Sequence, residues 1–169
     1  MDDKIPMLKN LSKKVDFIFI TGGNVNSFVD NFSLIKEIEG NKAKIILPID
    51  GFGASKPEDD PEYFKLVFDK GDKFIFDMGP LSMNLLFTVI GDCETVFWNG
   101  SLGITEHVFY KNSSEMLTKY LKNSLCEVII GVGDTAGFVN KYENNFDHIS
   151  TGGGASIEYI SNGTLIGIS

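Results

Sequence analysis

Glycines gather directly after several short apolar runs of this 169-residue chain. Four loops carry them: 21–23 (TGG), 99–103 (NGSLG), 131–135 (GVGDT) and 151–154 (TGGG). Glycine lets a backbone approach a ligand closely, and a helix that opens from such a loop points free N–H groups at an anion. The TGGG loop is the strongest signal, because each glycine at a helix start costs about 0.5 to 1 kcal/mol relative to alanine. The loops together predict a phosphate-binding crevice, although any one of them alone is also typical of a simple turn.

Established sequence motifs fit these loops poorly. The chain has no G-x-x-x-x-G-K-[ST] phosphate loop. Gly131, Gly133 and Gly137 resemble a dinucleotide fingerprint, but the third glycine comes one residue late and no acid stands about 20 residues on. The loop at 99–103 lacks the first glycine of a G-x-S-x-G nucleophile elbow. Neither His107 nor His148 is placed in a catalytic triad by its spacing, and no cysteine and histidine set has zinc spacing.

Asp134 and Thr135 end the glycine loop that follows the apolar run at 127–130, and they precede a predicted helix. A carboxylate at a strand-to-helix turn suits Mg²⁺ beside a nucleotide phosphate. It also suits a helix N-cap, and the two roles are compatible.

The elements that must position these loops are short strands alternating with helices. Uninterrupted apolar runs predict strands that are covered on both faces, as in a parallel sheet. They lie at 15–20, 43–47, 73–76, 95–98, 127–130 and 148–149. Helices are predicted at 4–14, 80–90, 113–125, 135–141 and 155–160, and a surface loop at 50–61. The fold class is therefore α/β, a single-domain three-layer α/β/α sandwich with a mainly parallel, Rossmann-like sheet. In such a sheet the ligand crevice lies at the carboxyl ends of the strands, where the glycine loops fall.

Charge and composition exclude several functions. The chain carries 15 basic and 23 acidic residues, a net charge of −8, so we expect no binding to nucleic acid or to an anionic membrane. No apolar run approaches the ~20 residues that a membrane helix needs. The N-terminus has no secretory pattern, and Cys93 and Cys126 are typical of buried reduced thiols. We therefore expect a cytoplasmic location.

Six segments resemble, in order and spacing, the C-terminal nucleotide-binding domain of phosphoglycerate kinase. They are 3–5 (DKI), 21–23 (TGG), 77–80 (DMGP), 98–106 (WNGSLGITE), 131–135 (GVGDT) and 150–156 (STGGGAS). The resemblance covers nearly the whole chain, and W-N-G-x-x-G together with S-T-G-G-G-A-S is highly specific. That family transfers a phosphoryl group between 1,3-bisphosphoglycerate and MgADP, and it uses two domains that close on each other.

The resemblance implies a role for individual residues. Gly22, Gly23, Phe76 and Ile104 would form an adenine slot, and Glu106 would hold the ribose hydroxyls. Asn99, Gly100 and Gly133 would bind the phosphates of ADP or ATP, Asp134 would hold Mg²⁺, and Thr135 would cap the adjacent helix. The catalytic set would be Gly152, Gly153 and Gly154, whose helix N–H groups face the transferred phosphoryl group, and Lys4, which neutralises its charge. Such a site acts by positioning and charge stabilisation.

The sequence departs from the family's pattern at Thr21, Ser101 and Val132, where the family has glycine, proline and glycine. No part of it corresponds to the N-terminal domain that binds 3-phosphoglycerate or 1,3-bisphosphoglycerate. We therefore expect this chain alone to be inactive and to bind MgADP or MgATP weakly. Two alternatives stay open, a stand-alone nucleotide-binding or regulatory module and, less compatible with the late glycine, a dinucleotide oxidoreductase.

Overall fold

The structure, a computed structural model, describes residues 4–38, 42–131, 138, 146, 148 and 149. Parallel strands form two of its sheets. β1 (Phe17–Phe19) pairs with β2 (Lys44–Ile46), and β7 (Glu127–Ile130) pairs with β6 (Thr95–Trp98) on one side and with β8 (His148–Ile149) on the other. The six predicted strands are all present, and the α/β class is confirmed.

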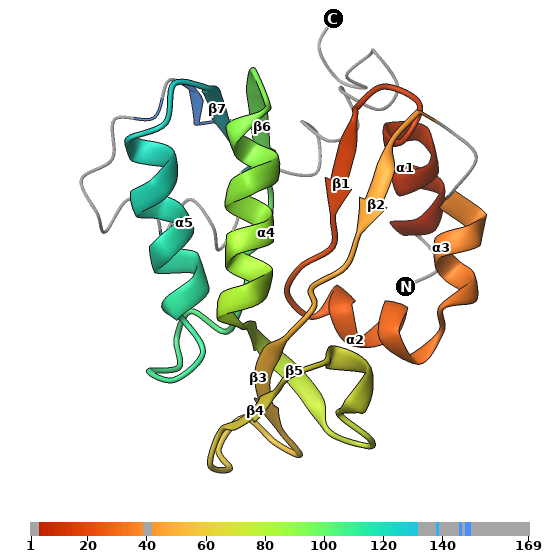
Figure 1. The fold of residues 1–169 in the computed structure, drawn as a ribbon, viewed down its shortest axis with the longest axis vertical. Coiled ribbons are helices and arrows are strands. Elements are labelled where there is room, and N and C mark those ends of the chain that lie inside the picture. Colours follow the sequence, from red (N-terminus) through yellow and green to blue (C-terminus); the bar gives the residue numbers. More distant parts are fainter. Residues whose placement is uncertain (1–3, 39–41, 132–137, 139–145, 147, 150–169) are drawn as a thin grey trace, which may run out of the picture.

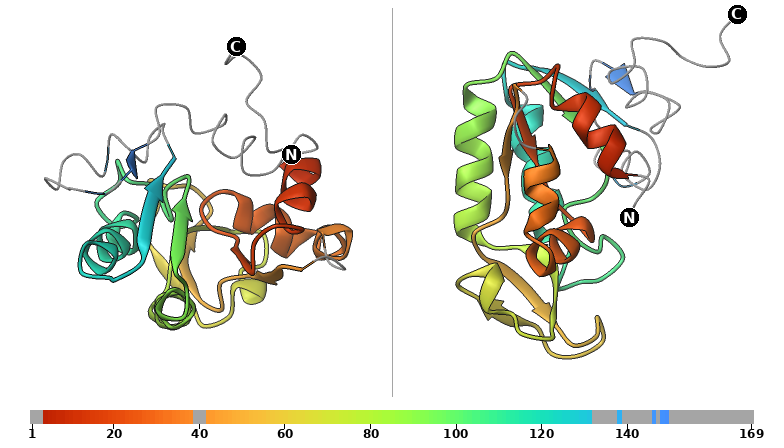
Figure 2. Two further views of the ribbon diagram at one scale, coloured as in Figure 1. Left: turned by 90° about the horizontal axis from the view of Figure 1, so that it is seen from above. Right: turned by 90° about the vertical axis from the view of Figure 1, so that its right-hand side faces the viewer.

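Helices pack beside each parallel sheet. In Figure 1, α4 (Pro80–Gly91) and α5 (Asn112–Lys122) lie side by side next to β6 and β7, whereas α1 (Lys4–Leu11) and α3 (Ser33–Ile38) lie beside β1 and β2. The views in Figure 2 show the same division. β1 joins the two halves, because Ile18 and Ile20 belong to one buried cluster while Phe19 packs against the other.

A third sheet is antiparallel and was not predicted. Its order is β4 (Glu62–Phe64), β3 (Gly51–Ala54) and β5 (Phe74–Met78), and it adjoins the N-terminal end of α4 (Figure 1). The prediction of a surface loop at 50–61 is therefore wrong over β3. Glycine hides this strand from a sequence pattern, yet the strand requires it, because a Cβ at Gly53 would lie 1.8 Å from the carbonyl oxygen of Phe74.

Two short helices were also missed, α2 (Asn24–Asp30) and α3. The residues of α2 are NVNSFVD, which are weak helix formers, so local propensity gives little signal. Burial of Val25 and Phe28 stabilises the helix instead. A 3₁₀ turn, η1 (Val67–Asp69), completes the described elements. The helices predicted at 135–141 and 155–160 fall largely outside the described residues, although Phe138 is helical and buried.

None of the helices in the described part of the chain has the length and apolar character needed to span a bilayer.

Candidate functional site

Loops that follow β1 and β6 meet at a cavity of about 340 Å³. This size lies at the lower end of the range for small-molecule sites. Three walls enclose the cavity: the turn into α2, strand β5, and the segment after β6. The lining residues are Gly22, Gly23, Asn26, Ile75, Phe76, Ser101, Gly103, Ile104 and Glu106.

The turn between β1 and α2 forms the first wall. Gly22 has φ +61°, a left-handed conformation that favours glycine, and a Cβ there would lie 2.7 Å from the carbonyl oxygen of Ser101. Gly23 has ordinary helical angles, and no atom lies within 4 Å of where its Cβ would be. Gly22 therefore permits the two loops to touch, whereas Gly23 leaves open space at the cavity.

Strand β5 forms the second wall through Ile75 and Phe76. Asn26 of α2 is 9% exposed and hydrogen-bonds the backbone of Ile75 in both directions. Its Nδ2 donates to the Ile75 carbonyl oxygen at 2.8 Å, and its Oδ1 accepts from the Ile75 N–H at 2.7 Å. The helix is thereby fixed to the edge of the strand.

The segment after β6 forms the third wall. The N–H of Ile104 donates to the carbonyl oxygen of Phe76 at 3.2 Å, which joins this segment to β5. Gly103 is required by close contact, because a Cβ there would lie 2.1 Å from the Tyr110 carbonyl oxygen. The ring of Tyr110 packs on that of Phe76 with centroids 5.2 Å apart, which holds the Phe76 ring in place at the cavity.

A buried carboxylate, Asp77, lies directly behind the cavity wall. It is 2% exposed, and one of its oxygens would contact a Cβ at Gly103 at 2.4 Å. Desolvation by burial raises the pKa of Asp77 to about 6, although hydrogen bonds from the hydroxyl and N–H of Ser113 and from the N–H of Met78 oppose this shift. Asp77 links β5 to the start of α5 and does not line the cavity.

The residues expected at the phosphates lie near the cavity but do not line it. Asn99 and Gly100 are exposed at the end of β6. The Gly131 N–H donates to the Trp98 carbonyl oxygen at 2.8 Å, and a Cβ at Gly131 would lie 2.5 Å from the Asn99 Oδ1. The ends of β6 and β7 are therefore adjacent, as the parallel sheet predicts.

The remaining predicted site residues fall outside the described structure. They are Gly133, Asp134, Thr135, Gly152, Gly153, Gly154 and the side chain of Lys4, whose backbone begins α1. Among the described residues, no group of three or more His, Cys, Asp or Glu side chains could hold a metal ion. The predicted Mg²⁺ ligand, Asp134, lies outside the described residues.

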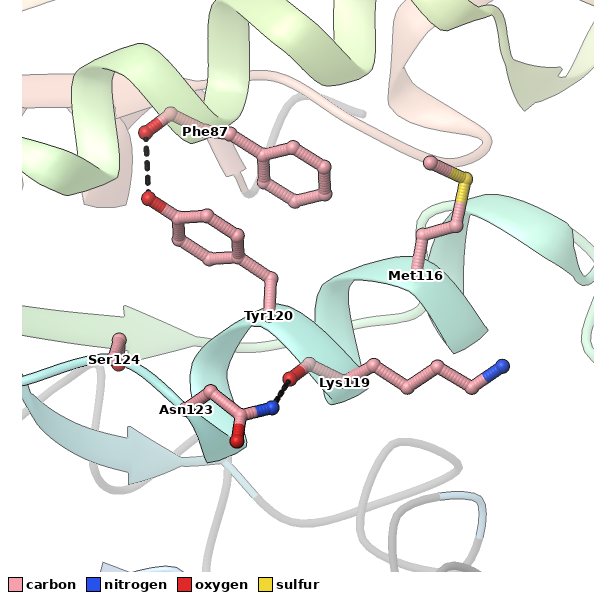
Figure 3. A pocket seen from close by; sticks show the side chains of 6 residues that line it. All are labelled: Phe87, Met116, Lys119, Tyr120, Asn123 and Ser124. Carbon is pink, nitrogen blue, oxygen red and sulfur yellow. Dashed lines mark hydrogen bonds between the residues drawn. The ribbon is translucent and has the colours of Figure 1, made fainter.

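A second hollow, of about 490 Å³, lies between α4 and α5. Figure 3 shows the rings of Phe87 and Tyr120 facing one another, with Met116 on the same side of α5 and Lys119 directed away from the rings. Phe87 lies in the C-terminal half of α4, and Tyr120, Asn123 and Ser124 lie at or just beyond the end of α5, toward the amino ends of β6 and β7. In parallel α/β sheets ligands bind at the opposite edge, so we place the functional site at the glycine-lined cavity.

Four residues of the cavity were not predicted as site residues: Asn26, Ile75, Ser101 and Gly103. Spacing gives no signal for Asn26, because Gly22 lies in the turn before α2 and shares no helical face with it. Ile75 is the neighbour of Phe76 on the same strand. Ser101 and Gly103 belong to the W-N-G-x-x-G motif, yet nothing in the sequence distinguishes their contacts.

Comparison with known proteins gives a single family. The family model described as Phosphoglycerate kinase matches residues 1–163. Among curated relatives, the phosphoglycerate kinase of Spiroplasma citri is 35% identical over 191 residues, covering 99% of this chain and 45% of that protein. The phosphoglycerate kinase of Levilactobacillus brevis is 33% identical over 187 residues, covering 99% and 47%.

A solved structure agrees. Phosphoglycerate kinase from Coxiella burnetii superposes with a TM-score of 0.81 at 25% identity, covering 95% of this chain and 47% of that one. The chain thus spans about half the length of the relatives it matches. On this evidence, together with the loops that meet at the cavity, the chain belongs to the phosphoglycerate kinase family.

Proposed function

We propose that this chain is the nucleotide-binding half of a phosphoglycerate kinase and that the glycine-lined cavity receives the adenosine part of MgADP or MgATP. One observation carries the proposal. The five residues that the resemblance assigns to adenine and ribose come from three separate segments, and all five line the same cavity. They are Gly22, Gly23, Phe76, Ile104 and Glu106.

The cavity has the chemistry that a nucleoside requires. Phe76 and Ile104 offer apolar surface to a flat ring, and the open space at Gly23 lets that ring approach the backbone. Glu106 is exposed at the cavity, and its carboxylate oxygens are acceptors for hydroxyl groups such as those of ribose.

The polyphosphate would extend from the cavity toward the ends of β6 and β7. Asn99 and Gly100 lie there, and the segment containing Gly133, Asp134 and Thr135 follows β7 directly. In this proposal Asp134 holds Mg²⁺, while Gly152–Gly154 and Lys4 stabilise the transferred phosphoryl group. Catalysis by such groups depends on positioning and on charge stabilisation of the transition state.

The reaction proposed for the whole enzyme is glycolytic phosphoryl transfer between 1,3-bisphosphoglycerate and MgADP in the cytoplasm. A second domain would bind the phosphoglycerate, and closure of the two domains would exclude water. The present chain by itself would bind nucleotide without turnover.

Calorimetry of the chain tests the proposal directly. We expect heat of binding with MgADP and MgATP, and none with NAD. A response to NAD alone would favour an oxidoreductase, and no response to any nucleotide would refute the assignment of the cavity.

A matched pair of glycine variants then locates the site. Gly23→Ala adds a methyl group where the free protein has open space, so we expect an unchanged melting temperature and about tenfold weaker MgADP binding. Gly91→Ala, in α4 and remote from the cavity, would place its Cβ 3.7 Å from the Tyr120 hydroxyl and should leave binding unchanged. Equal affinities in the two variants would show that the nucleotide binds elsewhere.

A further inference from the structure

The side chain of Asn26 makes two hydrogen bonds to the backbone of β5, where a neighbouring strand would normally pair. β5 lies at an edge of its sheet, with β3 on its other side, and no strand among the described residues pairs with its free edge. There the amide of Asn26 both donates to and accepts from the backbone of Ile75, at 2.8 Å and 2.7 Å. Both residues line the cavity.

The three walls of the cavity are joined in three different ways. The Ile104 N–H to Phe76 carbonyl bond joins the segment after β6 to β5, and the contact of Gly22 with the Ser101 carbonyl oxygen joins that segment to the α2 turn. Both of these links use backbone atoms. The hydrogen bonds between α2 and β5 are made by the side chain of Asn26, next to a buried cluster that contains Val25 and Phe28 of α2 and Ile75 of β5.

We propose that Asn26 is a positioning residue that sets the width of the nucleotide slot between Gly22–Gly23 and Phe76. The inference rests on the proposed function, because the slot is the cavity assigned there to adenosine. The oxygen and one N–H of the Asn26 amide are hydrogen-bonded to Ile75, which fixes the side chain against β5. One N–H remains, so an effect on affinity through the distance between the two walls is distinguished from direct base contact by a variant that keeps the bonds to Ile75 and lacks that donor.

The chemistry of the contact supplies a specific test. An ionised aspartate has no donor, so Asn26→Asp would place a carboxylate oxygen against the Ile75 carbonyl oxygen. Burial beside that carbonyl would raise the pKa of the new carboxyl group. Once protonated, its O–H would donate to the carbonyl oxygen and its C=O would accept the N–H, as the amide does.

We expect Asn26→Asp to bind MgADP about tenfold more weakly than the wild type at pH 8, and to recover to within about threefold at pH 5. The measured quantity is the ratio of the two dissociation constants across this range. Other titrations are common to both proteins and cancel in the ratio. The ionisable groups on the elements around Asn26 are Asp30, Lys36, Glu37, Asp69, Lys70, Asp77 and Glu106.

Val25→Ala is the matched control, because Val25 is 1% exposed in the same helix and does not line the cavity. It should lower stability with little change in MgADP affinity and no recovery at low pH. If Asn26→Asp weakens binding no more than Val25→Ala does, or if its ratio to the wild type is independent of pH, the inference is overturned.

Asn26→Gln covers the case in which the aspartate variant does not fold at pH 8. Glutamine keeps the donor and acceptor but lengthens the link by one methylene, so the slot changes width while the hydrogen bonds remain. We expect several-fold weaker MgADP binding, and wild-type affinity would refute the inference. Loss of the proposed function is distinguishable, because the wild type itself would then bind no MgADP.

Discussion

The N-termini of α4 and α5 are built alike and behave differently. Each meets a buried aspartate from another segment, and each aspartate accepts both the N–H and the hydroxyl of a serine in the helix's first turn. Asp50 pairs in this way with Ser82 of α4, and Asp77 with Ser113 of α5. Both carboxylates also lie against a glycine that leaves room for them, Gly79 and Gly103 respectively.

Both carboxylates have further donors, and for Asp77 these are the N–H groups of Met78 and Asn112. Asp50 also accepts the N–H of Leu81 at 3.1 Å and the hydroxyl of Tyr63 at 2.6 Å. Burial raises the pKa of Asp50, but the hydrogen bonds from Tyr63, Ser82 and Leu81 together outweigh it, and the pKa lies below its ordinary value. For Asp77 burial prevails, and the pKa is raised to about 6.

A buried aspartate at a helix start is therefore not by itself a stabilising charge. The balance between desolvation and the hydrogen bonds donated to the carboxylate decides whether the anion or the acid is the favoured form. At α4 the anion is held as a helix cap. At α5 the same pairing leaves a group that titrates near neutral pH directly behind the proposed nucleotide slot.

The largest expected effect is at the start of α4. Asp50→Ala removes the acceptor for two helix N–H groups and for the Tyr63 hydroxyl, so we expect a loss of about 3 kcal/mol in the free energy of unfolding. Urea denaturation at pH 7 measures it. Asp60→Ala, on the exposed loop nearby, should change stability by less than about 0.5 kcal/mol. Similar losses in the two variants would show that Asp50 does not cap α4.

Asp77→Asn tests whether Asp77 and Asp50 affect stability over different pH ranges. Because the folded pKa of Asp77 is raised, folding favours its protonated form, and that contribution is lost as the pH rises from about 4 to about 6. The asparagine variant does not titrate, so its stability relative to the wild type should rise by about 2 kcal/mol between pH 4 and pH 7. Denaturation curves across this range measure the change.

Asp50→Asn is the contrasting control. The folded pKa of Asp50 is lowered, so its contribution is present above the unfolded pKa near 4 and is lost as the pH falls further. Its deficit relative to the wild type should therefore stay constant from pH 5 to pH 8 and shrink only below pH 4. If both variants change over the same range, the distinction between the two helix starts is wrong.

The sequence predicts only part of the helix start at α4. The continuous apolar runs of β1, β6 and β7 identify strands, and Pro80 marks the first turn of α4. Asp50, by contrast, lies in a stretch that resembles a surface loop, although it is fully buried. Its role depends on a contact with Ser82, 32 residues away, which no local pattern reveals.

The candidate site shows the same division. Glycine loops after β1 and β6 predict where a ligand would bind, since the carboxyl ends of parallel strands share an edge. The contribution of Phe76 came only from the family resemblance, because β5 belongs to an antiparallel sheet that was not predicted. Asn26 was missed because its hydrogen bonds require the free edge of β5, which exists only in the folded chain.

Tyr63→Phe removes one hydrogen bond from the Asp50 carboxylate and leaves its bonds to α4 in place, so it disturbs the fold less than Asp50→Ala. Tyr63 is 42% exposed, so water can replace its hydroxyl, and we expect a loss of about 1 kcal/mol at pH 7. Because its hydrogen bond lowers the pKa of Asp50, the pH of half-unfolding in acid should shift upward. An unchanged acid transition would mean that Tyr63 does not stabilise the Asp50 anion.

The smallest effect is expected for Ser113→Ala, which removes one of the donors to the buried Asp77 carboxylate. The hydroxyl of Ser113 lowers the pKa of Asp77, so without it the pKa should move above about 6, as carboxyl carbon chemical shifts would report. The loss of stability should remain below about 1 kcal/mol at pH 4.5, where the group is protonated, and be larger at pH 7, where the anion has lost a donor. A pKa that does not rise would mean that Ser113 contributes only packing. The start of α5 would then differ from that of α4 in the role of its serine, and no longer only in the balance between burial and hydrogen bonding at the carboxylate.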